Sequence, residues 1–450
     1  MPNKTTAFPT TATQPVMPSN TLLLLYAVGQ LGWSLASFAP INLLNYYYLP
    51  PEDGKMRFLP LLAMPFLLGV INGASRAFDA FIDPLVANSS DRSKSSLGRR
   101  KVFMLIAFLP FAALSALVFC PPVVGESWVN TLFVAAMIFL FHIFLSLYTT
   151  PYSALVSELG HTSTARLKIS SMISIAYALG LGIGNQVYAV EAYLDNFFLS
   201  DTAFRLTLVI FAGIAAVCMV VPILFVNEKK YCAQQISDKT STEAIRSVLQ
   251  RRDFRIFITA DLVYWMALTF VQSGLVYYVT VLLRMDKSVI SLMTPVVLLL
   301  NVAMYVPVNY WANRYGKKVL LQHSFLLFAF VYAWVAMLGK IPLPNYMQGL
   351  LLIMLLIVPM TVFSILPTAV VADIADADGK QTGDYKAGMF FGVRILAMKL
   401  GVALANVLFS WCLLLGKSTA NDFGIRLTAI GAMMACLLAW RIFADFRTES

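Results

Sequence analysis

Three ionisable residues, Arg76, Asp79 and Asp83, fall inside an apolar run that continues back to about Phe58. Asp79 and Asp83 are four residues apart, so a helix places them on one face, with Arg76 one turn below Asp79 on nearly the same stripe. A carboxylate at membrane depth is costly and normally faces a wet cavity, where it marks an ion or proton path. We therefore interpret the two aspartates as a candidate cation site.

A later apolar run carries two further charges, Arg394 and Lys399. Lys399 lies about four turns into this run, too deep to reach the membrane surface comfortably, so it should meet a carboxylate. The deep acids on offer are Asp79 and Asp83. We therefore expect Lys399 to pair with them, and we place Arg76 and Arg394 in the same charge network.

Two hydroxyl residues, Thr149 and Thr150, directly precede Pro151 in another apolar run. Proline leaves the carbonyl of Leu147 without its helical donor, which would allow that carbonyl and the two hydroxyls to bind a small cation. The alternative is a plain proline kink, in which the hydroxyls bond to their own backbone. We include both threonines in the candidate cation site.

The chain that must position these groups has 450 residues, of which 59% are hydrophobic and 12% charged, with a mean hydropathy of +0.74. A soluble protein cannot bury that much apolar surface, so the composition predicts a polytopic membrane protein whose main partner is the lipid bilayer. The net charge of +10 does not indicate nucleic-acid binding, because the basic residues lie mostly on loops between apolar runs. The five cysteines show no metal-ligand spacing, and we expect no cofactor and no metal beyond a possible Na+.

Apolar runs long enough to cross a bilayer, which takes about 20 residues, predict about twelve helices. Their expected ranges are 21–49, 57–88, 101–120, 128–157, 166–190, 202–227, 254–283, 288–311, 317–340, 345–372, 384–415 and 422–446. A basic segment interrupts the pattern almost midway, which predicts two six-helix bundles at 21–227 and 254–446 joined by a linker at 228–253, with tails at 1–20 and 447–450. This is the arrangement of the major facilitator fold, an all-α membrane fold with its site between the halves.

The loop SSDRSKSSLGRRK after the second expected helix holds five basic residues, which marks a cytoplasmic loop. An even number of spans then places both termini in the cytoplasm, and we expect the plasma (inner) membrane. NRYGKK, at 313–318, follows the eighth expected helix where the basic loop follows the second. This weak internal echo favours duplication of one half.

Three blocks of the chain resemble the glycoside-pentoside-hexuronide cation symporters, the melibiose-carrier-like branch of the major facilitator superfamily. The blocks are SRAFDAFIDPLVANSSDRSKSSLGRRK, TTPYSALVSEL and ADIADADGKQTGDYKAGMFFGVRILAMKLG. The resemblance implies that Asp79 and Asp83 bind the coupling Na+, Li+ or H+ and that Lys399 joins the same network. It also implies that loop residues latch the inner helix ends, and these are Asp91, Arg92, Arg99 and Arg100.

The chain departs from the melibiose carrier where that carrier grips its sugar. A cation-site aspartate of the carrier falls at Thr149, a sugar-clamping aspartate at Ser34, and two tryptophans at Ser153 and Ser364. An arginine of the carrier has no counterpart near Ser171. The resemblance therefore keeps the cation machinery and loses the known galactoside contacts.

Polar and aromatic residues within the runs are candidates for a substrate cavity, although the same residues also serve as contacts between membrane helices. The candidates are Gln30, Ser34, Tyr152, Asn185, Tyr264, Trp265 and Gln272. Tyr46, Tyr47 and Tyr48 suggest an aromatic belt at the membrane surface. Asp261 is either a contact at a cytoplasmic helix end or part of the transport site.

The combined pattern predicts a symporter, not an enzyme, that uses Na+ or H+ to import a small solute by alternating access and works as a monomer. A sugar or glycoside is the first substrate class, and a lysolipid or other amphiphile is the alternative. A polytopic membrane enzyme is remote, because HExxH and GxSxG motifs are absent. A buried ion triad that only fixes helix packing remains a further alternative.

Overall fold

The computed structural model describes residues 18–50, 62–160, 163–231, 248–382 and 387–446. Regular structure in these ranges is helical. The first half contains α1 (Asn20–Asn42), α2 (Leu44–Tyr48), α3 (Leu67–Arg92), α4 (Lys101–Leu117), α5 (Trp128–Leu159), α6 (Ser163–Gly184), α7 (Val187–Leu194), α8 (Ser200–Phe225) and α9 (Glu228–Tyr231). The second half contains α11 (Arg252–Tyr277) with a π-helical turn η1 (Tyr278–Leu282), α12 (Ser288–Tyr315), α13 (Lys317–Met337), α14 (Asn345–Thr382), α15 (Ala387–Leu413) and α16 (Phe423–Ala444).

Ten of the described helical segments are long and apolar enough to cross a membrane. Two further helices complete the expected set of about twelve. α3 is long enough but carries the three deep charges Arg76, Asp79 and Asp83, and α4 is an apolar helix of 17 residues. The chain is therefore an integral, multi-pass membrane protein with the predicted all-α fold.

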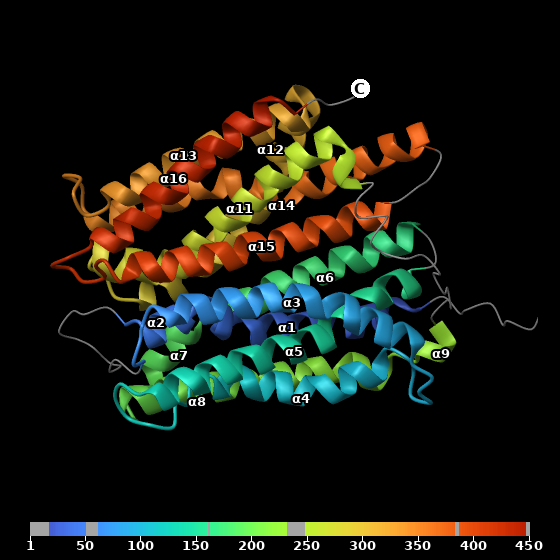
Figure 1. Ribbon diagram of the computed structural model, residues 1–450, viewed down its shortest axis with the longest axis horizontal. Coiled ribbons are helices and arrows are strands. Elements are labelled where there is room, and N and C mark those ends of the chain that lie inside the picture. The colour runs from blue at the N-terminus through green and yellow to red at the C-terminus, as the bar shows by residue number, and fades with distance from the viewer. Residues whose placement is uncertain (1–17, 51–61, 161–162, 232–247, 383–386, 447–450) are drawn as a thin grey trace, which may run out of the picture.

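The helices form two groups, one from each half of the chain (Figure 1). In the first, α1 packs on α6 and α8, and α5 packs on α3 and α4. In the second, α11 packs on α15 and α16, and α13 packs on α14 and α16. The long contact between the groups is made by α3 and α15, which lie side by side (Figure 1).

Glycines on α3 allow α15 to approach this closely. A Cβ atom at Gly69 would lie 2.8 Å from the Cβ of Ser410, and one at Gly73 would lie 2.3 Å from a methyl group of Val407. Real Cβ atoms do not sit at such distances from their neighbours. Small residues at contacts between membrane helices allow the backbones to approach each other in this way. The two halves are therefore closely packed along α3 and α15.

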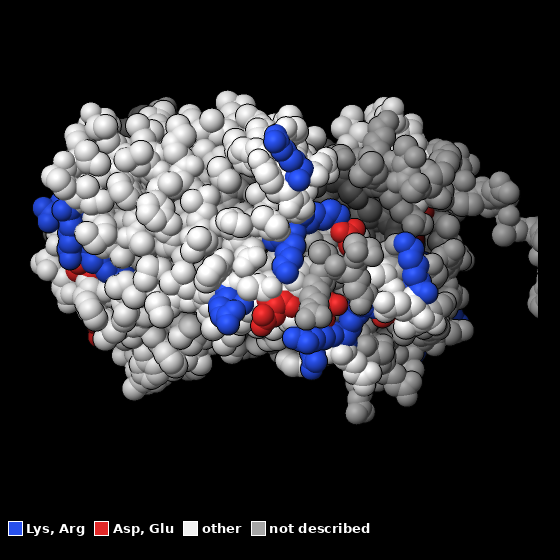
Figure 2. All heavy atoms as spheres, turned by 90° about the horizontal axis from the view of Figure 1, so that it is seen from above, with Lys and Arg blue, Asp and Glu red and all other residues white. Residues whose placement is uncertain are grey.

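The two ends of the molecule differ in their charge. The end that carries the 93–100 loop and α9, which we call the basic end, lies at the right of Figure 1, and the opposite end carries α2 and α7. Charged side chains on the face seen in Figure 2 gather at the left edge and from the middle of the view toward the right, with an uncharged stretch between these two groups. Gly98 and Gly316 both adopt positive φ in the corresponding loops of the two halves, which agrees with the internal echo in the sequence.

The structure corrects two details of the sequence interpretation. α14 continues to Thr382, beyond the expected end of this helix at residue 372, so Asp373 and Asp378 lie on the helix. Tyr46, Tyr47 and Tyr48 are 8%, 0% and 2% exposed, so they do not form a surface belt. They are buried because α2 turns inward at the opposite end, where Tyr47 stacks on Phe204.

Candidate functional site

The centre of the site is a cluster of three charges contributed by both halves. The Lys399 ammonium on α15 lies 2.8 Å from Asp79 Oδ2 and also contacts Asp83 Oδ2, both on α3. Asp79 is 1% exposed, whereas the Asp83 side chain is 27% and the Lys399 side chain 16% exposed. The ion pair expected from the sequence is therefore present, and its Asp83 side is partly exposed.

Ser146 on α5 sits between the two carboxylates on their other edge. Its Oγ lies 2.7 Å from Asp83 Oδ1 and also contacts Asp79 Oδ1, while the Thr150 hydroxyl donates to Asp83 Oδ1 at 3.0 Å. A hydroxyl carries one proton, so Ser146 can donate to only one of the two acids. The contact of Ser146 Oγ with the other carboxylate oxygen is favourable when a proton or a small cation lies between the two oxygen atoms. The charges of Asp79, Asp83 and Lys399 sum to minus one, which such a cation would neutralise.

The threonines expected at this site have different positions. Thr150 contacts Asp83, but the Thr149 hydroxyl donates to its own helix at Leu145 O, 2.9 Å away. The sequence interpretation missed Ser146. It lies four residues before Thr150, on the same face of α5, and this helical spacing is the signal that could have identified it.

Two other buried polar side chains, Arg76 and His142, lie near the cluster. Arg76 is 9% exposed, and its Nε has no hydrogen-bond partner among the described residues. Nδ1 of the buried His142 lies 3.9 Å from Asp79 Oδ2, beyond hydrogen-bond distance. Neither side chain takes the place of Lys399 as the direct partner of the aspartates.

Arg394 does not belong to this cluster, which corrects the charge network expected from the sequence. Its guanidinium contacts Asp261 on α11, with Nε 3.0 Å from Oδ2, and donates to Thr368 Oγ1 at 3.1 Å. Asp261 is 3% exposed. This second ion pair links helices within the second half and leaves Lys399 as the basic group at the aspartates.

The predicted latch residues Arg99 and Arg100 bind acids of the first half at the basic end. Both guanidinium groups lie 2.7 Å from Glu158 Oε1 at the end of α5. The Glu228 carboxylate accepts from the backbone N–H groups of Arg100 and Lys101 at the start of α4, where the helix dipole favours negative charge. Arg92 ends α3 with an exposed side chain, and Asp91 lies in α3 with a side chain outside those described.

The opposite end is closed by contacts between the halves. The Lys287 ammonium, just before α12, lies 2.5 Å from Glu191 Oε2 on α7, with side-chain exposures of 7% and 0%. The same ammonium lies 5.6 Å from the ring centroid of Tyr46 and 5.8 Å from that of Tyr188. Ser291 donates to Asn185 O at 2.7 Å. In contrast, the ion pairs of Arg99 with Glu158, Arg251 with Asp378 and Lys317 with Asp373 at the basic end each join elements of the same half.

A cavity of about 520 Å³ lies between the halves next to this closed end. Of the seven cavity residues expected from the sequence, Asn185 and Gln272 line it. Tyr152 is buried and stacks on Tyr26, and Tyr264 stacks on Phe363.

The remaining candidates do not line this cavity either. Ser34 is fully buried and packs against Gly180 of α6, which leaves no room there for a Cβ atom. Gln30 is 6% exposed on α1, and Trp265 is half-buried on α11. Ser34 therefore serves as a contact between helices, which was the alternative expected from the sequence.

Comparison with known proteins gives a family and a fold. A family model described as MFS/sugar transport protein matches residues 25–422. The inner membrane symporter YicJ of Escherichia coli (strain K12) is 21% identical over 381 residues, which cover 82% of this chain and 78% of YicJ.

Two solved structures share the fold. The nucleoside transporter NupG has a TM-score of 0.67 and 14% identity, and the alignment covers 95% of this chain and 99% of NupG. A partially occluded inward open conformation of the xylose transporter XylE from E. coli has a TM-score of 0.62 and 14% identity, over 94% of this chain and 97% of XylE. At these identities the likeness concerns the fold alone.

Proposed function

The chain belongs to the MFS/sugar transport protein family, and from that premise we propose that it is a cation-coupled symporter that imports a small solute by alternating access. The matched family, the relative YicJ and both solved structures are transporters, so the chain is a transporter and not an enzyme. What we propose beyond this is the coupling ion, the solute and the direction of transport.

The observation that carries the proposal is the Lys399 ammonium of one half shared by Asp79 and Asp83 of the other. Four oxygens from Asp79, Asp83, Ser146 and Thr150 gather at the carboxylates, and hard cations prefer oxygen ligands. A bound Na+ or H+ would bring the cluster of Asp79, Asp83 and Lys399 to neutrality and weaken the attraction of the carboxylates for Lys399. A cation and a solute that favour the same closed state then strengthen each other's binding by linkage.

A sugar or glycoside is the proposed solute, in keeping with the description of the family. The sugar-clamping residues of the melibiose carrier are absent at Ser34, Ser153 and Ser364, so this protein must hold its solute by other groups. We place the basic end in the cytoplasm, because basic loops stay inside, and with it both termini, in the plasma (inner) membrane. The proposed working unit is the monomer.

The cation site can be tested without knowing the solute. Purified protein is heated in the presence of increasing Na+, Li+ or K+ at several pH values, because a ligand that binds the folded state raises its stability. We expect Na+ or protonation to stabilise the wild type and to have no such effect on Asp83→Asn. Thr149→Ala is the matched control, since its hydroxyl bonds to its own helix, and it should behave as the wild type.

The same assay then identifies the solute. Sugars and glycosides are screened with and without the stabilising cation, and a ligand whose effect depends on that cation is carried into uptake measurements. Gradient-driven uptake should vanish in Asp83→Asn while the protein remains folded and inserted. If Asp83→Asn keeps the full cation response, the coupling site proposed here is wrong.

A further inference from the structure

A buried histidine beside the cation site is left without a hydrogen bond. His142 on α5 is 1% exposed, and its Nδ1 has no hydrogen-bond partner among the described residues. Native proteins keep few buried polar atoms without a partner, because each one costs free energy. Asp79 Oδ2 lies 3.9 Å from this nitrogen. A shift of about 1 Å would therefore bring the two atoms to hydrogen-bond distance.

His142 begins a row of polar side chains along α5. His142, Ser146 and Thr150 are spaced four residues apart, so they lie on one face of the helix. Ser146 contacts both carboxylates and Thr150 donates to Asp83, so this face is turned toward α3. His142 lies at the Asp79 end of the row. It therefore belongs to the same face of α5 as the hydroxyl groups of the cation site.

Lys399 and His142 face the same oxygen of Asp79. The ammonium lies 2.8 Å from Asp79 Oδ2, whereas the histidine nitrogen lies 3.9 Å from it. Asp79 is 1% exposed, so water has little access to its carboxylate, in contrast to the Asp83 side chain, which is 27% exposed. If Lys399 withdraws, Asp79 Oδ2 needs another donor from the protein, because a buried carboxylate without hydrogen bonds is strongly disfavoured.

We propose that His142 is a positioning residue, which becomes the hydrogen-bond donor to Asp79 Oδ2 when Lys399 withdraws from it, as it does when a cation binds between the carboxylates. The inference rests on the proposed function, because it specifies how that cation site is completed. The hydrogen bond holds the Asp79 carboxylate so that its other oxygen, Oδ1, stays beside Ser146 and faces the cation.

A neutral donor suits this role better than a charged one. A neutral imidazole carries one N–H group and can satisfy the carboxylate oxygen without repelling a cation. Arg76 is the other buried donor near the acids, and its Nε has no partner among the described residues. Its guanidinium is permanently charged, so it would oppose a bound cation as the Lys399 ammonium does.

The first test needs no bound cation. Thermal unfolding of the full-length protein is measured at one pH, in a buffer whose cation is choline, for the wild type, His142→Leu, Lys399→Met and the double variant. In the wild-type background His142→Leu should not lower Tm, because Nδ1 has no hydrogen bond to lose. In the Lys399→Met background it should lower Tm, because His142 then donates to Asp79. A histidine that only fills space would change Tm equally in both backgrounds.

The second test measures the affinity for Na+ and Li+ from the rise in Tm at the same pH. Loss of a hydrogen bond to a carboxylate in the cation-bound state should weaken binding about tenfold to a hundredfold in His142→Leu. His142→Asn retains an N–H group near the position of Nδ1 and should restore most of the affinity. His323→Leu is the control, because His323 is exposed on α13 and its Nδ1 lies 2.7 Å from Val319 O of its own helix.

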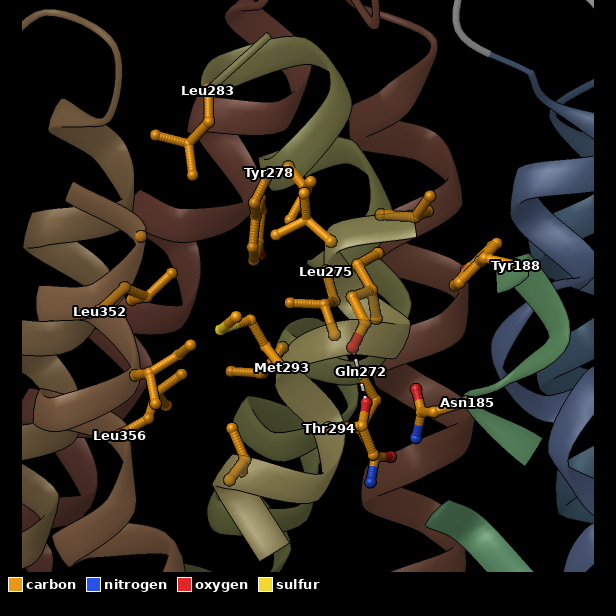
Figure 3. Close-up of a pocket in the computed structure, with 18 of the residues that line it drawn as sticks. Asn185, Tyr188, Gln272, Leu275, Tyr278, Leu283, Met293, Thr294, Leu352 and Leu356 are labelled. Atoms are coloured by element: carbon orange, nitrogen blue, oxygen red, sulfur yellow. Dashed lines mark hydrogen bonds between the residues drawn. The ribbon is translucent and has the colours of Figure 1, made fainter. Parts of the chain in front are cut away.

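The substitutions leave the lining of the cavity between the halves unchanged. Gln272, Met293 and Leu356 are among the lining residues (Figure 3), and none of those described as lining the cavity lies on α3, α5 or α15. An altered cation affinity in His142→Leu is therefore not the result of a changed cavity wall. His142→Phe keeps a ring of similar shape and takes the place of His142→Leu if that variant does not fold.

Two outcomes would overturn the inference. One is an equal change of Tm in both backgrounds, and the other is a wild-type cation affinity in His142→Leu. Failure of the proposed function gives a different result, in which no cation stabilises the wild type. The first test alone then decides whether His142 serves Asp79 in the absence of Lys399.

Discussion

Loss of one partner from the ion pair between Lys287 and Glu191 should open the opposite end of the protein. Both side chains are nearly inaccessible when the halves meet, and both would become hydrated if the halves separated there. Lys287→Met removes the Lys287 ammonium from the buried Glu191 carboxylate in the closed arrangement. The open arrangement carries no such cost, so the substitution shifts the balance between them.

The size of the shift follows from burial. Removal of one partner of a buried pair costs about 3–5 kcal/mol, and about 1.4 kcal/mol corresponds to a tenfold change in an equilibrium. Lys287→Met should therefore favour opening by roughly two to three and a half orders of magnitude. Glu191→Gln should have a smaller effect, because the Tyr46 and Tyr188 rings still attract the remaining ammonium by about 0.5–2 kcal/mol. The double variant has no unpaired charge and should lie close to the wild type.

The opening of this end can be measured by labelling a cysteine introduced in place of Met293, which lines the cavity next to it. The native cysteines are first replaced by serine. A membrane-impermeant thiol reagent applied from outside should react fastest with Lys287→Met and slowly with the wild type and the double variant. Arg205→Gln is the control, because its pair with Asp201 lies within α8 and leaves the contact between the halves intact. Labelling of both single variants at the wild-type rate, or equally fast labelling of the double variant, would refute the reasoning.

Three further predictions concern other parts of the molecule. Lys399→Met should lower thermal stability in the absence of cation and tighten cation binding, because two adjacent carboxylates lose the ammonium that contacts both of them. Titration of Tm against Na+ and pH measures both effects. Gly73→Ala should reduce stability and transport, since its Cβ would overlap α15, whereas Gly213→Ala meets nothing within 4 Å and should leave both unchanged in the same unfolding and uptake assays. The hydrogen bond from Arg426 lowers the pKa of Asp422 in the folded protein. This pair therefore stabilises the folded protein at pH values above the pKa of the unfolded state, and the stabilisation is lost as the pH falls through the lower pKa of the folded state. The fall in Tm between about pH 6 and pH 3 should be smaller in Asp422→Asn than in the wild type.

The deep charges were the part of the site most accessible to sequence reasoning. Lys399 lies too far inside its helix to reach water, and the chain offers few acids at that depth, so its pairing with Asp79 and Asp83 follows from electrostatics. The hydroxyl partners were harder to assign. Ser146, Thr149 and Thr150 are equally compatible with the composition of α5, and the rotation of that helix decides which of them face the carboxylates.

The position of Arg394 shows a second limit of sequence reasoning. Hydropathy places Arg394, Lys399 and Asp261 at membrane depth, but it does not give the direction in which each side chain leaves its helix. Arg394 precedes Lys399 by five residues, which turns it toward α11 and Asp261 instead of α3. Buried aromatic residues such as Tyr152 and Tyr264 present the same difficulty, because a polar tip on a large apolar ring suits a cavity wall and a helix contact equally well.

The cation cluster lies next to the firm contact between α3 and α15, and this location bears on how an ion could act. Gly73, which admits α15, lies six residues before Asp79, while Ala403, which faces it, lies four residues after Lys399. The acids and the amine are thus held by the two helices that make the long contact between the halves, whereas the Lys287 pair lies where α7 meets α12, next to the cavity. A cation that replaced Lys399 would weaken an attraction between the halves beside this contact without a large displacement of the aspartates. Since binding at either site can bias the arrangement of the halves only through its different affinity for the two arrangements, a solute held by both halves and an ion placed between them would influence each other equally in both directions.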